Sequence, residues 1–215
     1  MHNSSAEIRV LTKKYLGTDF YIEIVKFKTK TTDPYEKKTK NRFELRNALY
    51  NFLKRQKKFI FEDALDLRTV PQKIGIRRKN YYSSLSHTEE TGAFAFDSSP
   101  IGVDIEKREK IKKEIVARVS QKMEMALDSN FQLIWSIKEA AFKAIPFMVQ
   151  PKTVSEIKIE RIESITTKKN SPIQACLFSA STKKTPFIKL EGICVFNQDS
   201  QLALAKVLVG KNSKK

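Results

Sequence analysis

The sequence predicts an α+β fold in which antiparallel sheets pack against helices. Apolar residues recur at helical spacing over residues 42–55, 111–127 and 131–145. Strand-like stretches lie between these segments and again after residue 154. Helices interleaved with runs of strands in this order are typical of helices packed on antiparallel sheets. Each half of the chain offers a helix and several strands, so a pseudo-dimer of two similar lobes is one arrangement of this fold.

The N-terminal half opens with two apolar-rich stretches, residues 8–15 and 20–27. The second alternates well enough to predict a strand. Residues 29–41 are polar and rich in lysine, which is typical of a connector. An amphipathic helix is predicted over residues 42–55, and residues 64–70 are a further candidate strand.

The centre of the chain reads as three strands joined by turns, the second turn containing Pro100. These strands and turns fall at residues 81–88, 89–92, 93–96, 97–100 and 101–106. We place a lobe boundary at the second turn, which gives an N-terminal lobe of residues 1–97 and a C-terminal lobe of residues 98–215.

The C-terminal half predicts two helices followed by strands. The helices cover residues 111–127 and 131–145, and Pro146 ends the second because proline cannot continue a helix. Four strand-like segments with polar turns between them follow at residues 154–162, 173–178, 187–196 and 202–209.

The composition describes a basic, folded protein. The 215 residues include 41 Lys and Arg against 24 Asp and Glu, a formal charge of +17, with 40% hydrophobic residues. That apolar content excludes a disordered tail, and the length allows a real core. A charge of this size attracts nucleic acid, phosphorylated cofactors, acidic proteins or anionic membranes. For the terminal lysines of residues 211–215 we prefer a role in solubility.

Several classes of protein are excluded by missing patterns. The glycines form neither a dinucleotide-binding fingerprint nor a P-loop. Two cysteines, Cys176 and Cys194, make neither a zinc cluster nor a disulfide framework. No apolar run reaches the roughly 18 residues that span a bilayer, and the N-terminus lacks the apolar core of a signal peptide. We therefore expect a cytoplasmic protein with free thiols.

Two acidic residues share one face of the strand predicted over residues 101–106. Strand geometry sends Asp104 and Glu106 to the same side, while Val103 and Ile105 face the opposite side. The two carboxylates repel each other unless water, a lysine or a cation lies between them. One interpretation is a solvent-facing edge, and the other is a site for a hard cation such as Mg²⁺, which prefers oxygen ligands.

The helix predicted over residues 131–145 carries a further acid and a lysine. Glu139 and Lys143 are one turn apart, on a different flank from the apolar stripe that includes Ile137. They form either an ordinary salt bridge or a third acidic ligand beside a cation that binds phosphate. Spacing alone leaves both interpretations open.

Three elements together resemble the signature of the 4′-phosphopantetheinyl transferases. The segment IGVDIE at residues 101–106 resembles the element G-[IV]-D-[IVL]-E, and WSIKEAAFK at 135–143 resembles W-[ASC]-x-K-E-[AS]-x-x-K. Upstream, LSHT at residues 85–88 resembles the LSHS element of the family. The resemblance covers about residues 81–145, and the length of the chain favours the two-lobed Sfp-type branch.

The resemblance implies the transfer of the phosphopantetheine arm of coenzyme A to a serine of an apo acyl or peptidyl carrier protein. Adenosine 3′,5′-bisphosphate is the by-product. It implies that Asp104, Glu106 and Glu139 ligate Mg²⁺, with Mn²⁺ as an alternative, and that Glu139 is the base for the serine. It also implies that Lys143 stabilises the pyrophosphate as its bond breaks, with Lys138 near the same phosphates.

The resemblance assigns the 3′-phosphate of coenzyme A to Ser86 and His87. The family often carries Gly-Lys-Pro upstream of this element, whereas this chain has other basic residues there. Four further candidates for a phosphate contact are therefore Lys73, the basic run at residues 77–79, Arg42 and Arg46.

An acidic apo carrier protein is the expected macromolecular partner, because the basic chain would attract it. We expect Lys112, Lys113 and Arg118 to form the docking face, although a solvated helix face is the other interpretation. We also expect a monomer that binds coenzyme A, with no nucleic acid and no membrane as partner. A basic nucleic-acid-binding module and an inactive relative that only binds coenzyme A or a carrier are the alternatives.

Overall fold

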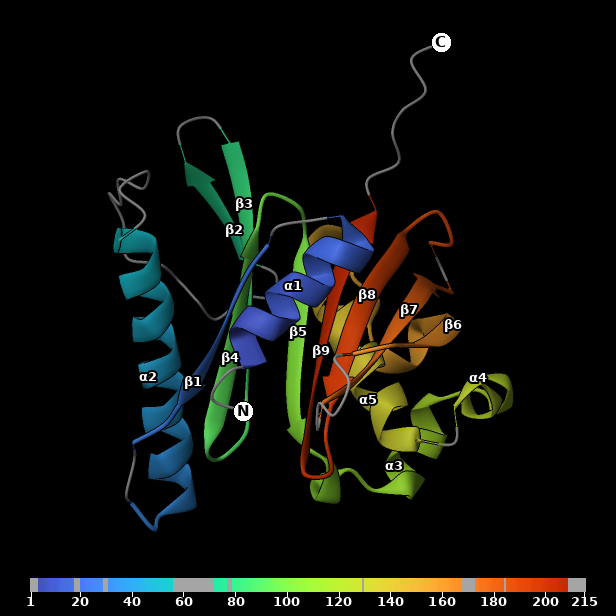
Figure 1. Cartoon of the computed structure of the whole chain (residues 1–215), viewed down its shortest axis with the longest axis horizontal. Coiled ribbons are helices and arrows are strands. Elements are labelled where there is room, and N and C mark those ends of the chain that lie inside the picture. Colours follow the sequence, from blue (N-terminus) through green and yellow to red (C-terminus); the bar gives the residue numbers. More distant parts are fainter. Residues whose placement is uncertain are drawn as a thin grey trace.

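The computed structural model describes residues 4–17, 20–28, 31–55, 72–76, 79–128, 130–167, 173–183 and 185–208, with the backbone alone for 72–76 and 79–80. It confirms the α+β class, with two antiparallel sheets packed against helices (Figure 1). The first sheet has the order β1-β4-β3-β2, formed by Tyr21–Lys26, Thr91–Asp97, Lys79–His87 and Gln72–Ile76. The second has the order β5-β9-β8-β7-β6, formed by Ile101–Lys107, Ser200–Leu208, Lys189–Phe196, Gln174–Thr182 and Ile157–Ile165.

The helices lie on the faces of these sheets. The α-helices are α1 (Ser4–Leu16), α2 (Pro34–Arg55), α3 (Lys113–Val119), α4 (Lys122–Leu127) and α5 (Phe131–Ala144). The chain also has three short 3₁₀ helices in its described part, η1 (Arg108–Lys110) before α3, and η2 (Phe147–Val149) and η3 (Val154–Glu156) after α5. Within the described part of the chain, none of the helices combines the length and the apolar character needed to cross a bilayer.

The predicted strands are confirmed to within a few residues, but the helices differ in three places. Residues 4–16 form helix α1, which the sequence analysis did not assign. Helix α2 begins at Pro34 rather than at residue 42, because Pro34 suits a first helical position and the Asp33 carboxylate accepts a hydrogen bond from the Tyr35 amide. The predicted helix 111–127 is divided into α3 and α4. The candidate strand 64–70 lies outside the described residues.

The two sheets follow the same plan of connection. In each sheet the first strand pairs with the last strand, and the other strands follow in descending order. In each sheet, too, the segment after the first strand contains a helix that packs on that sheet, α2 in one case and α5 in the other. The two sheets, of four and five strands, therefore share an order of strand pairing.

Strand β4 explains how the first sheet is covered on both faces. Phe94 and Phe96 point to one face, where they pack against α2, while Ala93 and Ala95 point to the other. The alanine face belongs to a core that also contains residues of α1 and of strands β5, β8 and β9. Helix α1 thus lies over the junction of the two sheets, between β4 and β9 in Figure 1. This shared core joins the two halves.

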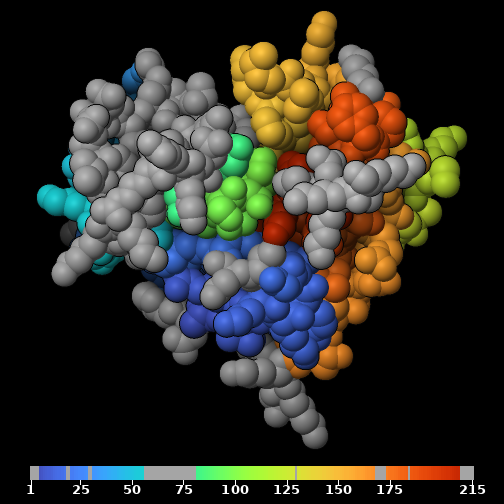
Figure 2. Space-filling view, turned by 90° about the horizontal axis from the view of Figure 1, so that it is seen from above, coloured from blue at the N-terminus to red at the C-terminus, as the bar shows by residue number. Residues whose placement is uncertain are grey.

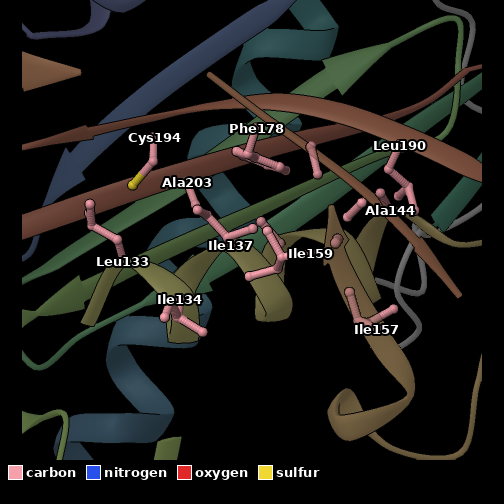
Figure 3. Packing of buried hydrophobic residues seen from close by; sticks show 14 of the residues in the cluster. Leu133, Ile134, Ile137, Ala144, Ile157, Ile159, Phe178, Leu190, Cys194 and Ala203 are labelled. Atoms are coloured by element: carbon pink, nitrogen blue, oxygen red, sulfur yellow. The ribbon is translucent and has the colours of Figure 1, made fainter. Parts of the chain in front are cut away.

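Helix α5 covers the other face of the second sheet. Its residues Leu133 and Ile137 face sheet residues such as Phe178 and Ala203 (Figure 3). The helix approaches β5 so closely at Gly102 that an added Cβ atom would lie 2.0 Å from the carbonyl oxygen of Ala140. Glycine is therefore required at this point of β5.

We predict that Gly102→Ala destabilises the protein by about 1–3 kcal/mol, because the methyl group would push α5 away from β5. The control is Gly92→Ala, because the atoms nearest to its methyl group would belong to side chains rather than to backbone, Phe27 at 2.7 Å and Leu45 at 2.9 Å. Chemical denaturation followed by circular dichroism measures both variants. If both variants lose the same stability, the close backbone contact at Gly102 is not what requires glycine there.

Candidate active site

A buried ion pair marks the point where β3, β5 and α5 meet. The Nζ atom of Lys143 lies 2.7 Å from Oδ1 of Asp104, whose side chain is 1% exposed. The hydroxyl of Ser86, on β3, donates to the same carboxylate oxygen at 3.0 Å, and Lys143 Nζ lies 3.2 Å from this hydroxyl. The hydroxyl of Ser84 accepts a hydrogen bond from the Val103 amide at 3.0 Å, which holds β5 against β3. The acid, the lysine and the serine thus come from three separate elements.

Two further carboxylates surround Lys143. Its ammonium lies 3.9 Å from Glu139 Oε2, one helical turn away. Burial, with the negative charge of Asp104, raises the pKa of Glu106 to about 7, although Lys143 and a hydrogen bond from Trp135 oppose the shift. Burial also raises the pKa of Glu139. For Lys143, burial favours loss of the proton, but the attraction of the carboxylates outweighs it and raises the pKa. These three acids and one ammonium are called the acid cluster below.

The residue types of the acid cluster fit a divalent cation, although the cluster is closed by the lysine. Across the described residues, no group of three or more His, Cys, Asp or Glu side chains is arranged as a ready metal site. Asp104 Oδ2, however, is buried and has no hydrogen-bond partner among the described residues. A buried carboxylate oxygen without a partner is costly, and a cation is one way to satisfy it. The ammonium of Lys143 now supplies the positive charge of the cluster.

A basic pocket of about 630 Å³ adjoins the acid cluster at Glu106. Its walls come from the start of α2, the β3–β4 turn and the end of β5 with η1. The polar residues that line it include Lys37, Asn41, His87, Glu89, Lys107 and Lys110. Except for His87, none of these was predicted from the sequence, because lysines near a turn or in a connector carry no spacing signal. These wall elements lie at the lower end of the molecule in Figure 1, whereas Figure 2 views the opposite end, where residues coloured green lie between the N-terminal elements in blue and the C-terminal elements in orange and red.

His87 is held as a neutral ring at the edge of this pocket. Its Nε2 atom accepts a hydrogen bond from Arg42 Nε at 3.2 Å, which requires an unprotonated nitrogen. Its Nδ1 atom lies 3.1 Å from the carbonyl oxygen of Thr88 and therefore carries the proton. Burial lowers the pKa of His87. The hydrogen bond to the Thr88 carbonyl oxygen opposes this shift, and the positive charges of Arg42, Lys38 and Lys143 reinforce it. The histidine thus orients Arg42.

The structure corrects the expectation for Lys138. Its side chain is fully buried, and its ammonium pairs with Glu124 Oε1 at 2.8 Å and donates to the carbonyl oxygen of Ile157 at 2.5 Å. It therefore ties α5 to α4 and β6 and lies away from the pocket that could hold phosphates. The helical spacing already indicates that Lys138 is buried, because Lys138 follows Ile134 by one turn and precedes Ala141 on the buried stripe.

The same ion pair explains why the predicted helix 111–127 is divided. Glu124 Oε2 accepts the Gln121 amide at 2.6 Å and so starts α4 with a capping box. Glu124 Oε1 also accepts the Ile159 amide at 2.7 Å. Because Glu124 must reach both groups and Lys138, the backbone leaves the helical path at Ser120, which is extended.

The remaining predicted residues are placed as follows. Ser86 contacts the acid cluster, because its hydroxyl is engaged with Asp104 and Lys143 rather than with the pocket. Arg46 is half-buried on α2, and Lys73 lies on β2 with its side chain outside the described part. Residues 77 and 78 of the basic run are also outside it. The expected docking residues, Lys112 just before α3 and Lys113 and Arg118 within it, are exposed.

Comparison with known proteins adds no assignment: no protein-family model matches the chain, and no curated protein sequence matches it significantly.

We predict that Lys138→Met destabilises the protein by about 3–5 kcal/mol, because it leaves Glu124 as an unpaired buried charge. The double variant Lys138→Met with Glu124→Gln removes both charges and should recover most of that loss. Urea denaturation at neutral pH measures the single and double variants. If the double variant is as unstable as the sum of its two single variants, the ion pair does not have the role described here.

We predict that the free energy of unfolding falls as the pH rises from about 4.5 to about 7, because Glu106 binds its proton more tightly in the folded state. Glu106→Gln cannot ionise, so its stability should change less over this range and exceed that of the wild type most clearly at pH 8. Urea midpoints from pH 5 to pH 8, in the presence of a chelator, measure this. Glu109→Gln, which removes an exposed carboxylate, is the control, and equal pH dependence of all three proteins would refute the assignment.

Proposed function

We propose that this chain is a Mg²⁺-dependent 4′-phosphopantetheinyl transferase, which moves the phosphopantetheine arm of coenzyme A to a serine of an apo carrier protein. The observation that carries the proposal is the acid cluster. Two carboxylates, from β5 and α5, lie within ion-pair distance of one lysine, and a third, Glu106, interacts with it electrostatically and lines a basic pocket. A phosphorylated donor needs positive charge for its phosphates, and a transfer to serine needs a base near the reacting phosphorus.

The basic pocket is the proposed site of the nucleotide part of coenzyme A. Its lysines Lys37, Lys38, Lys107 and Lys110 supply charge for phosphate groups, and its volume of about 630 Å³ is in the usual range for a small-molecule site. Because Glu106 lines the pocket, a nucleotide bound there would direct its pyrophosphate toward the acid cluster.

Asp104, Glu106 and Glu139 are the residues that would hold Mg²⁺, or Mn²⁺ in its place. When bound, the ion would neutralise part of the charge on the carboxylates and on the donor pyrophosphate. Lys143 would then turn from Asp104 toward the pyrophosphate and stabilise the charge on the leaving group. Its raised pKa keeps it protonated for this role.

The serine of the carrier would be activated by Glu139. Burial raises the pKa of this carboxylate, which makes it a stronger base than an exposed glutamate. The serine oxygen forms a bond to the phosphorus that carries the pantetheine arm, and the bond from this phosphorus to adenosine 3′,5′-bisphosphate breaks. The serine proton passes to Glu139, and the leaving group keeps the electron pair of the broken bond.

The arrangement of the chain supports two similar lobes, residues 1–97 and 98–215, because both sheets follow one plan of connection. We propose that the first lobe supplies most of the nucleotide pocket and the second supplies the acid cluster. The acidic carrier would approach a basic surface that includes Lys112, Lys113 and Arg118, which are exposed. We also propose a cytoplasmic monomer.

We predict that the protein, mixed with coenzyme A, Mg²⁺ and a panel of apo carriers, adds one phosphopantetheine to a carrier, detected by intact mass. Asp104→Ala and Glu139→Ala should each reduce the initial rate by about 10²-fold or more, because one removes a ligand and the other also removes the base. The control is Glu163→Gln, an exposed carboxylate on β6, which should transfer at the wild-type rate.

Normal transfer by the Asp104 or Glu139 variant would refute the site. Coenzyme A binding without transfer to any carrier would favour an inactive relative. A nucleic-acid-binding module would instead bind DNA or RNA with a steep dependence on salt, and Asp104→Ala would leave that binding intact or improve it.

A further inference from the structure

The β3–β4 turn places a carboxylate in the wall of the basic pocket. Glu89 pairs with Lys110, which comes from η1, and its Oε2 atom lies 4.0 Å from Nζ of Lys37, which comes from α2. All three side chains line the pocket. Two lysines from opposite halves of the chain therefore both lie near one carboxylate, that of Glu89.

The backbone of this turn is fixed, so the Glu89 side chain can move alone. The Thr88 hydroxyl accepts the amides of Glu90 and Thr91 at 3.3 Å and 3.1 Å, and the Thr88 amide donates to the Thr91 carbonyl oxygen at 2.7 Å. On the other side, the Asn41 side-chain amide donates to the carbonyl oxygen of Glu89 at 2.9 Å. A rotation of the Glu89 side chain would thus free Lys37 and Lys110 without any change in the turn.

A phosphate monoester is better suited to this position than a carboxylate. It carries close to two negative charges near neutral pH and three oxygens that accept hydrogen bonds, whereas the carboxylate carries one charge. The Glu89 and Lys110 side chains are 57% and 49% exposed, and ion pairs at this exposure are weak because water screens them. A ligand with a monoester phosphate can therefore displace the carboxylate.

We propose that Lys37 and Lys110 bind the 3′-phosphate monoester of the donor nucleotide, and that Glu89 occupies its position until the ligand displaces it. This assignment rests on the proposed function, which supplies coenzyme A as the donor. The pyrophosphate of the same ligand is a less suitable occupant, because it has to reach the acid cluster to react. Ser86 is also excluded from this role, since its hydroxyl is engaged with Asp104 and Lys143.

The test compares two ligands that differ only in the 3′-phosphate, coenzyme A and dephospho-coenzyme A, by calorimetric titration. Glu89→Gln should bind coenzyme A about two- to fivefold more tightly than the wild type, because no charged competitor remains. Lys110→Gln should bind it about tenfold more weakly. Neither variant should change the affinity for dephospho-coenzyme A. Since Glu89 and Lys110 are half exposed, both variants should fold, which a thermal melt verifies.

Glu109→Gln is the matched control, because it removes an exposed carboxylate from the same 3₁₀ turn as Lys110 and changes the net charge equally. If this control tightens coenzyme A as much as Glu89→Gln, or if dephospho-coenzyme A responds like coenzyme A, the assignment is overturned. The titrations contain no carrier protein. The wild type could bind coenzyme A, and the variants could change its affinity as expected, while no carrier is modified. That result would refute the proposed transfer and support the proposed phosphate site.

Discussion

The contact between Lys143 and Asp104 is the one on which the rest of the site depends. A carboxylate that is 1% exposed is strongly unfavourable without a partner, so α5 must bring its lysine to β5. The helix can approach that closely only because Gly102 has no side chain. Ser86 then joins the pair from β3, so a single charged contact links the catalytic helix of the proposed site to strands of both sheets.

An acidic region and a basic region lie next to each other around this contact. The acid cluster holds three carboxylates and one ammonium, and burial is the main reason that the pKa values of Glu106 and Glu139 are raised, with the negative charge of Asp104 acting in the same direction. The adjoining pocket is lined by four lysines and two glutamates among its charged residues. A ligand that carries phosphates and arrives with a divalent cation matches both parts at once. A nucleic acid would match the lysines and be repelled by the carboxylates.

The sequence predicts the parts of the fold that depend on local patterns. The strands expected over residues 93–96 and 101–106 and the apolar stripe on α5 depend on local patterns, and the structure has them where they were expected. The basic pocket could not be predicted, because Lys37 and Lys110 meet only when α2 and η1 are folded onto the same turn. Lys138 was assigned by resemblance to the phosphates, although its place on the apolar stripe indicated burial.

The two sheets share an order of strand pairing, but their first strands differ at the positions that form the site. When the first strands are aligned on Lys26 and Lys107, Glu23 corresponds to Asp104, but Val25 takes the place of Glu106 and Tyr21 the place of Gly102. Tyr21 stacks on Phe52 of α2, and this ring fills the space that Gly102 leaves for α5. The contact between β1 and α2 is therefore aromatic, and Glu23 accepts a hydrogen bond from the Tyr21 hydroxyl at 2.6 Å. The first half instead contributes the basic wall at the start of α2, where Lys37 and Asn41 face the β3–β4 turn.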